Sequence, residues 1–330
     1  MSLPPIETPL GAMRFNSDSQ KLEYWMGSAW MQIKTFSPNL DGGSRAIWAA
    51  GSSSTNVIDY VTIPTAGNAI DFGDTTLRKY NSGGASNTRG VFGGGDPAGG
   101  VNTLEFITIS TTGDGVNFGD LKTALTYVAG CSSQTRLVIG GGKPSPSSYT
   151  NEMSFVTIAS TGDSQNFGDL TLGRSNIGAL ASPTRGIFAG GYTPTMVNNI
   201  DFCTIASTGD AQDFGDITES SGTNSAQCGS STRGIIWAGY PAGTNIDSLI
   251  IASKGNTFSF GDSTISLKYR NGTSDTVRGL SGGGQDGTGD GNTIEYINIS
   301  EGGTAIDFGD LTTADHDSGA CFSNGHGGLG

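Results

Sequence analysis

Short apolar segments separated by small polar residues run along almost the whole chain, and one stretch shows the pattern. Residues 176–181 are small and mostly apolar, and residues 185–191 read Arg-Gly-Ile-Phe-Ala-Gly-Gly. Residues 199–205 alternate apolar and polar side chains, and residues 211–214 end in Phe. Each segment has the length of a strand and is followed by turn residues, and alternation with a period of two is typical of a β-strand. The stretch therefore predicts four short strands in succession.

This four-strand unit occurs six times. Its second segment starts at an arginine, its last segment ends in Phe-Gly-Asp, and successive phenylalanines of that motif lie 46 to 49 residues apart. Four strands in a unit of this length are typical of a propeller blade. We therefore expect an all-β fold, a six-bladed β-propeller. Its scaffold residues are Arg45, Arg89, Arg136, Arg185, Arg233, Arg278, Phe72, Phe118, Phe167, Phe214, Phe260 and Phe308.

The two ends of the repeat array are complementary. The first repeat begins at its second segment, while residues 317–322, after the last Phe-Gly-Asp, match a first segment. We expect residues 319–322 to pair with the strand at 45–48, which closes the propeller and protects its edges. The repeat arginines should bind carbonyls or acids of the Ser-Thr-Gly-Asp turns, because a guanidinium binds several oxygens at once. Asp169 and Asp216 should lie about 20 Å from Arg185, beyond its reach.

Residues 1–36 do not follow the repeat, and residues 37–43 have the composition of a linker to the propeller at 37–330. Segments 11–16, 21–25 and 30–33 alternate and are separated by turn residues, which predicts a three-stranded meander with its aromatic side chains on one face. So small a sheet is marginal alone, so we expect it to pack on another protein or on the propeller. The candidate attachment residues are Phe15, Tyr24, Trp25 and Trp30.

Composition narrows the functional classes. The 54 glycines exclude a helical solenoid, because glycine is costly inside helices. A net charge of −13 disfavours a nucleic-acid partner, and no apolar run is long enough to span a bilayer or resembles a signal peptide. Cys131, Cys228 and Cys321 share one repeat position, which indicates small buried hydrophobic residues and not disulfides.

No catalytic or metal site is visible in the sequence. His316 and His326 stand near the C-terminus without a nucleophile partner, so we expect both at the surface, with His326 exposed in a glycine-rich tail. The turn acids Asp163 and Asp210 should cap turn backbone and not bind calcium, because their neighbours would not converge on one point. We therefore expect a non-enzymatic protein without cofactor or metal.

The loops after the double glycine and after Phe-Gly-Asp vary between repeats and should share one face. Variable loops on a rigid scaffold often carry recognition, although drift in unconstrained loops gives the same pattern. Three tyrosines in these loops are the candidate ligand-binding residues: Tyr149, Tyr192 and Tyr240.

Several sequence segments resemble known families. The double glycine, the apolar strand after it and the late aromatic residue resemble kelch repeats, with Phe in place of the usual Trp. "GAMRFNSDSQKLEYWMGSAWMQI" resembles the short N-terminal module of tail-fibre and other structural proteins of tailed bacteriophages. The "STGD…FGDL" unit and the ending "CFSNGHGGLG" resemble glycine-rich repeats of structural proteins from marine phages, especially those of cyanobacteria.

The resemblance implies a structural virion protein, made in the bacterial host and present in several copies in a tail, fibre or capsid assembly. Its partners would be other virion proteins and, through the variable loops, a host-surface glycan. Two alternatives are a carbohydrate-binding adhesin and a glycan-active enzyme. The enzyme would need a unique pair of carboxylates on the variable face, which the sequence does not show.

Overall fold

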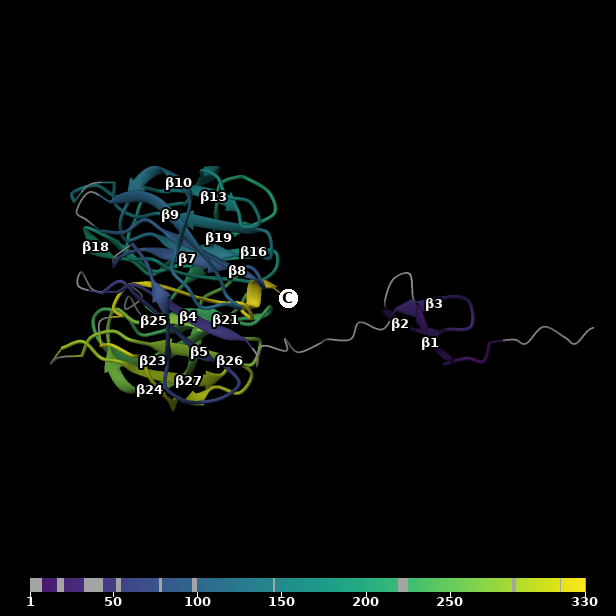
Figure 1. The fold of residues 1–330 in the computed structure, drawn as a ribbon. Helices are drawn as coiled ribbons and strands as arrows, with labels where there is room; N and C mark the ends of the chain where they lie inside the picture. The colour runs from purple at the N-terminus through teal and green to yellow at the C-terminus, as the bar shows by residue number, and fades with distance from the viewer. Residues whose placement is uncertain are drawn as a thin grey trace, which may run out of the picture. The chain divides into compact units, whose positions relative to one another are not determined.

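The computed structural model describes residues 8–16, 21–32, 44–51, 55–76, 79–96, 100–144, 146–218, 225–286, 289–314 and 316–329. The chain divides into two compact units, Met1–Gly43 and Ser44–Gly330 (Figure 1). Among the described residues, the regular elements are β-strands apart from one 3-10 turn, η1 (Gly327–Leu329). The all-β class predicted from the sequence is confirmed. The predicted linker at 37–43 lies outside the described residues.

The small unit is a three-stranded antiparallel meander of β1 (Met13–Asn16), β2 (Lys21–Trp25) and β3 (Trp30–Gln32), as predicted. The prediction that its aromatic side chains share one face is wrong. Tyr24 and Trp25 are consecutive in β2 and therefore point to opposite faces. The register puts Phe15 on the side of Tyr24, and Trp25 directly opposite Trp30 on the other side.

The large unit contains six antiparallel sheets of the same design, which we number in chain order (Figure 1). Sheet 5 carries a short fifth strand, β28 (Gly303–Thr304), and a hairpin, β17 (Tyr192–Thr193) and β18 (Thr195–Met196), stands apart. The sheets are sheet 1, β30 (Ala320–Ser323), β4 (Arg45–Ala49), β5 (Val57–Thr62) and β6 (Ile70–Asp74); sheet 2, β7 (Ser82–Ala85), β8 (Arg89–Gly93), β9 (Val101–Thr108) and β10 (Val116–Leu125); sheet 3, β11 (Ala129–Ser132), β12 (Arg136–Gly140), β13 (Glu152–Thr157) and β14 (Gln165–Asp169); sheet 4, β15 (Gly178–Ala181), β16 (Arg185–Ala189), β19 (Asn199–Thr204) and β20 (Gln212–Asp216); sheet 5, β21 (Gln227–Gly229), β22 (Arg233–Trp237), β23 (Gly243–Ile250) and β24 (Phe258–Leu267); and sheet 6, β25 (Asn271–Ser274), β26 (Arg278–Gly282), β27 (Thr293–Asn298) and β29 (Ile306–Asp310).

Sheet 4 shows how the sequence sets these elements. Its four strands fall in the four segments predicted from residues 176–214. The chain leaves β16 through Gly190 and Gly191, whose φ angles of +67° and +122° are positive. Glycine adopts such angles without the steric penalty of a Cβ atom, so the glycine pair ends the strand and starts the variable loop.

The C-terminal strand completes the first sheet. β30 pairs antiparallel with β4, so that Ala320 lies opposite Ala49 and Phe322 opposite Ile47. This is the pairing predicted between residues 319–322 and 45–48, and it is confirmed. The first strands of the sheets also contact one another in the order β30, β7, β11, β15, β21, β25, and β25 in turn contacts β30. The two ends of the large unit are therefore joined within one sheet.

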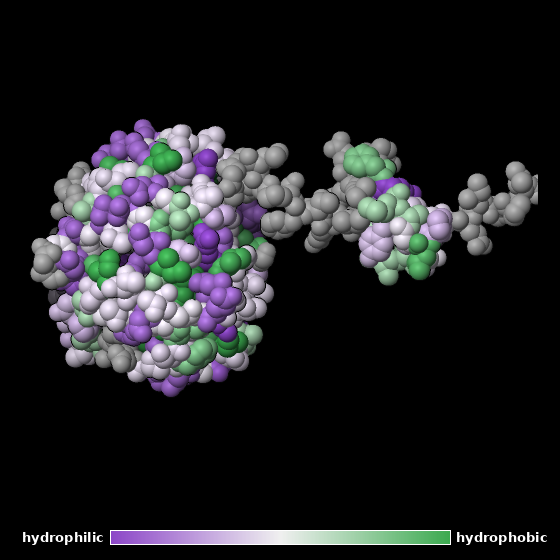
Figure 2. All heavy atoms as spheres, turned by 90° about the horizontal axis from the view of Figure 1, so that it is seen from below, coloured by the Kyte–Doolittle hydropathy of each residue, from purple (hydrophilic) through white to green (hydrophobic). Residues whose placement is uncertain are grey.

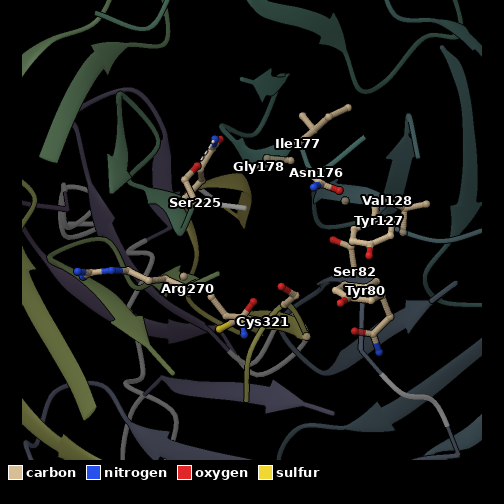
Figure 3. A pocket seen from close by; sticks show the side chains of 18 residues that line it. Tyr80, Ser82, Tyr127, Val128, Asn176, Ile177, Gly178, Ser225, Arg270 and Cys321 are labelled. Atoms are coloured by element: carbon tan, nitrogen blue, oxygen red, sulfur yellow. Dashed lines mark hydrogen bonds between the residues drawn. The ribbon is translucent and has the colours of Figure 1, made fainter. Parts of the chain in front are cut away.

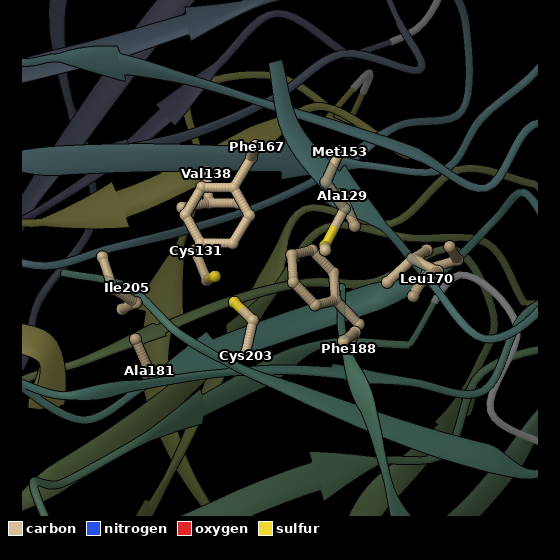
Figure 4. Packing of buried hydrophobic residues seen from close by; sticks show 12 residues of the cluster. Ala129, Cys131, Val138, Met153, Phe167, Leu170, Ala181, Phe188, Cys203 and Ile205 are labelled. Atoms are coloured by element: carbon tan, nitrogen blue, oxygen red, sulfur yellow. The ribbon is translucent and has the colours of Figure 1, made fainter. Parts of the chain in front are cut away.

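The hydrophobic core lies between neighbouring sheets, with one cluster at each of the six junctions. Figure 4 shows the cluster between sheets 3 and 4, where Phe167 and Phe188 surround the sulfur atoms of Cys131 and Cys203. All four cysteines are free thiols, as predicted for Cys131, Cys228 and Cys321, although Cys321 is only half-buried. The phenylalanines of the Phe-Gly-Asp motifs are buried as predicted, except the half-buried Phe260 of sheet 5.

Each repeat arginine bonds to the next sheet. Arg89 Nη1 donates to the carbonyls of Ile158 and Ala159, at 3.1 and 3.0 Å, where β13 enters its turn. The same pattern runs through all six junctions, including that from sheet 6 to sheet 1, and each guanidinium also lies over an aromatic ring of its own sheet. The predicted bonds to turn carbonyls are confirmed, and Arg185 binds the carbonyls of Ile251 and Ala252.

The turn acids also act between sheets. Asp163 Oδ1 accepts from the backbone N–H of Asp120 at 3.0 Å, and Asp210 Oδ1 accepts from that of Asp169 at 3.1 Å. Side-chain-to-backbone bonding is confirmed, but the prediction that these acids cap turn backbone is wrong, because the capped N–H groups belong to the Phe-Gly-Asp strand of the preceding sheet.

A row of buried carboxylates in the third strands was missed by the sequence analysis. Asp201 in β19 is fully buried and accepts from Thr171 Oγ1 at 2.6 Å and from Thr171 N–H at 3.1 Å, both in the segment after β14. Asp59, Glu105, Asp247 and Glu295 occupy the same position and bind threonines of the preceding sheet. Threonine–carboxylate links thus accompany the apolar cluster at five junctions. At the junction of sheets 2 and 3, Glu152 binds Thr123 instead.

Both histidine predictions are wrong. His316 is fully buried, with Nε2 3.0 Å from Asp59 Oδ2 and Nδ1 3.0 Å from the Ala50 carbonyl. His326 is half-buried, and its Nε2 donates to the Ala85 carbonyl at 2.8 Å. The last residues fold back against the first strands, because the small side chains there leave room: a Cβ atom on Gly328 would stand 1.9 Å from the Ser132 carbonyl oxygen.

Acid should weaken this C-terminal packing. Burial lowers the pKa of His326 below its ordinary value of 6.5, and Nδ1 accepts the Gly328 N–H at 3.1 Å, a bond that a proton on Nδ1 would remove. The unfolded chain takes up the proton first as the pH falls, so stability is complete above about pH 6.5 and decreases below it. We expect the melting temperature to fall more between pH 7.5 and 5 in the wild type than in His326→Gln. An equal fall in both proteins would contradict this role.

Candidate functional site

A polar hollow lies among the beginnings of the six first strands. Residues of all six sheets line it. The space among the lining atoms is about 580 Å³, a volume that includes open solvent. Figure 3 shows Tyr80, Tyr127 and Asn176 along one side of this space, with Ser225 and Arg270 across from them. We call it the first hollow. Amides, hydroxyls, phenols and the guanidinium of Arg270 make up its polar lining, and no carboxylate belongs to it among the residues that the structure describes.

Six of the nine tyrosines gather in the loops around the first hollow. The candidate residues Tyr149 and Tyr192 meet edge to face, with ring centroids 6.0 Å apart, and Tyr240 stacks on Tyr269 at the same distance. Tyr80 stacks on Tyr127, with centroids 3.9 Å apart. Two of the predicted ligand tyrosines, Tyr149 and Tyr192, are therefore in contact with each other. The third, Tyr240, is in contact with Tyr269.

The sequence analysis did not select three further tyrosines, Tyr80, Tyr127 and Tyr269, although they share a position in the repeat. Each stands in the loop after Phe-Gly-Asp, shortly before a first strand, and has a φ angle of +67°, +59° or +61°, respectively. A bulky residue rarely adopts this left-handed conformation, and such strain is often found at functional sites. The sequence analysis considered tyrosines only in the loops after the double glycine or near it.

Three of the seven lysines lie on these rings, although the chain is acidic overall. Lys143 Nζ lies 5.0 to 6.0 Å from the centroids of Tyr127, Tyr149 and Tyr192. Lys79 lies over Tyr80, and Lys268 over Tyr240 and Tyr269. The loop face therefore carries a rim of tyrosine and lysine, which we define by these nine residues and call the tyrosine rim.

Four phenols of the tyrosine rim have raised pKa values. Burial is the largest cause of the increase for Tyr80, Tyr127, Tyr149 and Tyr269. These hydroxyls therefore stay protonated well above neutral pH, and each can both donate and accept a hydrogen bond.

Several polar groups of the first hollow have no hydrogen-bond partner among the described residues. Both amide atoms of Asn81 are in this state, although only 4% of its surface is exposed. Three further atoms also lack a partner among the described residues: Asn176 Oδ1, Gln227 Oε1 and Ser318 Oγ. Buried polar groups are normally satisfied, so these atoms indicate bound water or a ligand.

The C-terminal segment lies at the other end of the space. A second hollow is lined by the first strands below the first hollow and by His326 and Gly327 of the C-terminal segment. His326 also lies 3.2 Å from Ser132 Oγ of β11. The C-terminal segment therefore lines one end of the space, and the tyrosine rim lies around the other.

The candidate attachment residues divide between the two faces of the small sheet. Trp25 and Trp30 lie 5.4 Å apart between centroids, and Arg14 covers Trp30 at 4.2 Å while bonding to Glu23. On the other face Phe15 is 66% exposed, together with Met13 and Met31. In the large unit, by contrast, apolar side chains are scattered singly among polar ones on the face seen in Figure 2. An exposed apolar face on so small a sheet is typical of an interaction surface.

No protein-family model and no curated protein matches this chain. Within the described ranges, no group of three or more histidine, cysteine or acidic side chains is placed to hold a metal ion. The same ranges contain no helix with the length and apolarity needed to cross a membrane.

Proposed function

We propose that the six sheets are the blades of a six-bladed β-propeller. The cyclic contacts of the first strands support this arrangement, because β25 reaches β30 as each earlier strand reaches the next. The arginine links support it as well, since Arg278 of sheet 6 binds the carbonyls of Ile63 and Pro64 in sheet 1 as each earlier arginine binds the next sheet. Pairing of the C-terminal strand with the first repeat is a common way to close such a ring.

We further propose that the protein is a non-enzymatic structural protein of a tailed-phage virion, associated with tail or capsid in several copies, whose tyrosine rim contacts a glycan of the host surface. The virion assignment rests on the resemblance of the N-terminal module and of the repeats. The observation that carries the recognition role is the tyrosine rim, because phenols combine apolar ring area with a hydroxyl that bonds sugar hydroxyls.

A carbohydrate-binding adhesin outside a virion is the second candidate, and the same tyrosine rim favours it. Among the described residues, none that lines the first hollow carries a carboxylate, which favours binding over glycan hydrolysis, because hydrolysis needs an acid and a second carboxylate. Mass spectrometry of purified particles separates the two binding roles. Peptides of this chain in the particles support the virion protein, and their absence from particles made by cells that express it excludes that role.

Removing residues 1–36 should leave the large unit folded but prevent its incorporation into particles. The reason is that the small unit has its own contacts and exposes Met13, Phe15 and Met31 on one face. The measurement is the amount of the truncated chain in purified particles, with its melting temperature as the folding control. A point variant, Phe15→Ser, should reduce incorporation in the full-length chain. Normal incorporation of the truncated protein would rule out an attachment role.

A further inference from the structure

We propose that the first hollow is the binding subsite for the terminal sugar residue of a neutral glycan, which enters end-on from the tyrosine rim. This inference rests on the proposed recognition role and gives it a location and a ligand class. The first observation behind it is the set of unpartnered polar atoms. Asn81 is buried, lines the first hollow and leaves both amide atoms without a partner in the described chain.

The chemistry of the lining selects the ligand class. An amide presents one acceptor and two donors, and every sugar hydroxyl both donates and accepts. Asn81 has an unpartnered donor and acceptor, and Asn176 and Gln227 each have an unpartnered carbonyl oxygen. These atoms expose almost no surface in this structure, so binding requires the side chains to turn toward the sugar. Convergence of such groups in one concave site is typical of recognition of a small polyhydroxylated ligand.

Charged ligands fit the lining less well. A metal ion would need carboxylates, and none of the described residues that line the first hollow carries one. A phosphate or carboxylate would need a free cation, and Arg270 is the cation among the described lining residues. Its guanidinium is already bound to Glu295 at 3.4 Å and to Ser263 at 3.0 Å. The lysines of the tyrosine rim lie on the rings around the entrance, where they meet the rest of the glycan chain.

Bound water alone is the competing explanation, since water often satisfies buried polar groups. The two explanations differ in what a polar-to-apolar substitution does. Asn81→Leu removes the unpartnered amide and keeps a branched side chain. It should leave the melting temperature unchanged or raise it, because no hydrogen bond to a described residue is lost. The same variant should abolish sugar binding.

The test uses the full-length chain and methyl glycosides of glucose, galactose, mannose, rhamnose and N-acetylglucosamine. Glucuronate and N-acetylneuraminate serve as acidic comparators. Saturation-transfer NMR and calorimetry should detect at least one neutral glycoside at millimolar concentration. Asn81→Leu should weaken that binding about 10-fold or more, as loss of a dedicated hydrogen-bonding group does. Asn81→Ala provides the same comparison with a smaller side chain.

Asn292→Leu is the matched control. Asn292 Nδ2 donates to the Leu311 carbonyl at 3.4 Å, away from the first hollow, so its loss should lower the melting temperature and leave binding unchanged. Binding of none of the neutral glycosides overturns the proposal and leaves water as the occupant. If a neutral glycoside binds and Asn81→Leu does not weaken its binding, the sugar binds elsewhere near the tyrosine rim. The proposed recognition role then stands, but the proposed subsite is wrong. Binding of the acidic sugars alone assigns recognition to the lysines and also overturns it.

Discussion

Removal of residues 315–330 is expected to leave a protein that aggregates and melts about 10 °C or more below the wild type. The deletion takes away β30, so that β4 becomes an unpaired edge, and exposed edges of this kind pair with other chains. It also removes Phe322, which is 3% exposed and stacks on Phe92 of sheet 2 with centroids 5.7 Å apart. The apolar cluster between sheets 1 and 2 therefore loses Ala320 and Phe322.

Size-exclusion chromatography and thermal unfolding measure this effect. Deletion of residues 327–330 is the matched control, because it removes η1 and keeps β30 in place. The control should remain soluble, with a smaller loss. Phe322→Ala should cost about 3–5 kcal/mol, the usual range for a buried phenylalanine. A soluble, non-aggregating product of the long deletion with the wild-type melting temperature would show that β30 does not hold the two ends together.

The features that the sequence predicted well are those that repeat. The strand positions, the closing pair of β30 with β4 and the arginine links all follow from a local pattern that occurs at each junction. Repetition makes such features visible, because one unit predicts the other five. The C-terminal segment after β30 belongs to no repeat, and its packing by His326 depends on tertiary contacts that no local pattern encodes.

The buried acids were missed for a physical reason. In β19, Ile200 and Phe202 lie on one face, so strict alternation assigns Asp201 to the opposite face, which is solvated in an isolated antiparallel sheet. Here each sheet is packed between two others, so Ile200 and Asp201 are both fully buried. The available signal was the acid at this same position in five of the six repeats, with a threonine after the Phe-Gly-Asp of the preceding unit.

The tyrosine rim was predicted in part. Both sets of loops were predicted to vary and to share one face, but only tyrosines after the double glycine or near it were selected as ligand candidates. The unpartnered amide of Asn81 has no sequence signature, because satisfaction of a hydrogen bond depends on neighbours from other sheets. The repeat therefore predicts where the loops lie, while the chemistry of the first hollow requires the assembled structure.

Asp201→Leu is expected to destabilise the protein by about 3–5 kcal/mol, because it leaves a buried guanidinium without its counter-ion. Arg174 and Asp201 are both fully buried, with Nη2 3.1 Å from Oδ2. Burial lowers the pKa of Arg174, which shows that the site disfavours the unpaired charge. The guanidinium Nε and Nη1 atoms also lack partners among the described residues. Without Asp201, Arg174 keeps only its bond to the Phe188 carbonyl at 3.2 Å.

Arg174→Met should cost less, about 1–3 kcal/mol, because Asp201 keeps the two donors of Thr171. The double variant Arg174→Met, Asp201→Leu should be more stable than Asp201→Leu alone, since a buried pair often gives way to apolar side chains at little cost. Chemical unfolding of all four proteins yields the coupling energy, which we expect at about 1–3 kcal/mol. The pair of exposed Lys122 and half-buried Glu152 serves as the control, and Lys122→Met should change stability by less than about 1 kcal/mol. If Asp201→Leu proved no more damaging than Lys122→Met, the carboxylate row would not be what holds the sheets together at this junction.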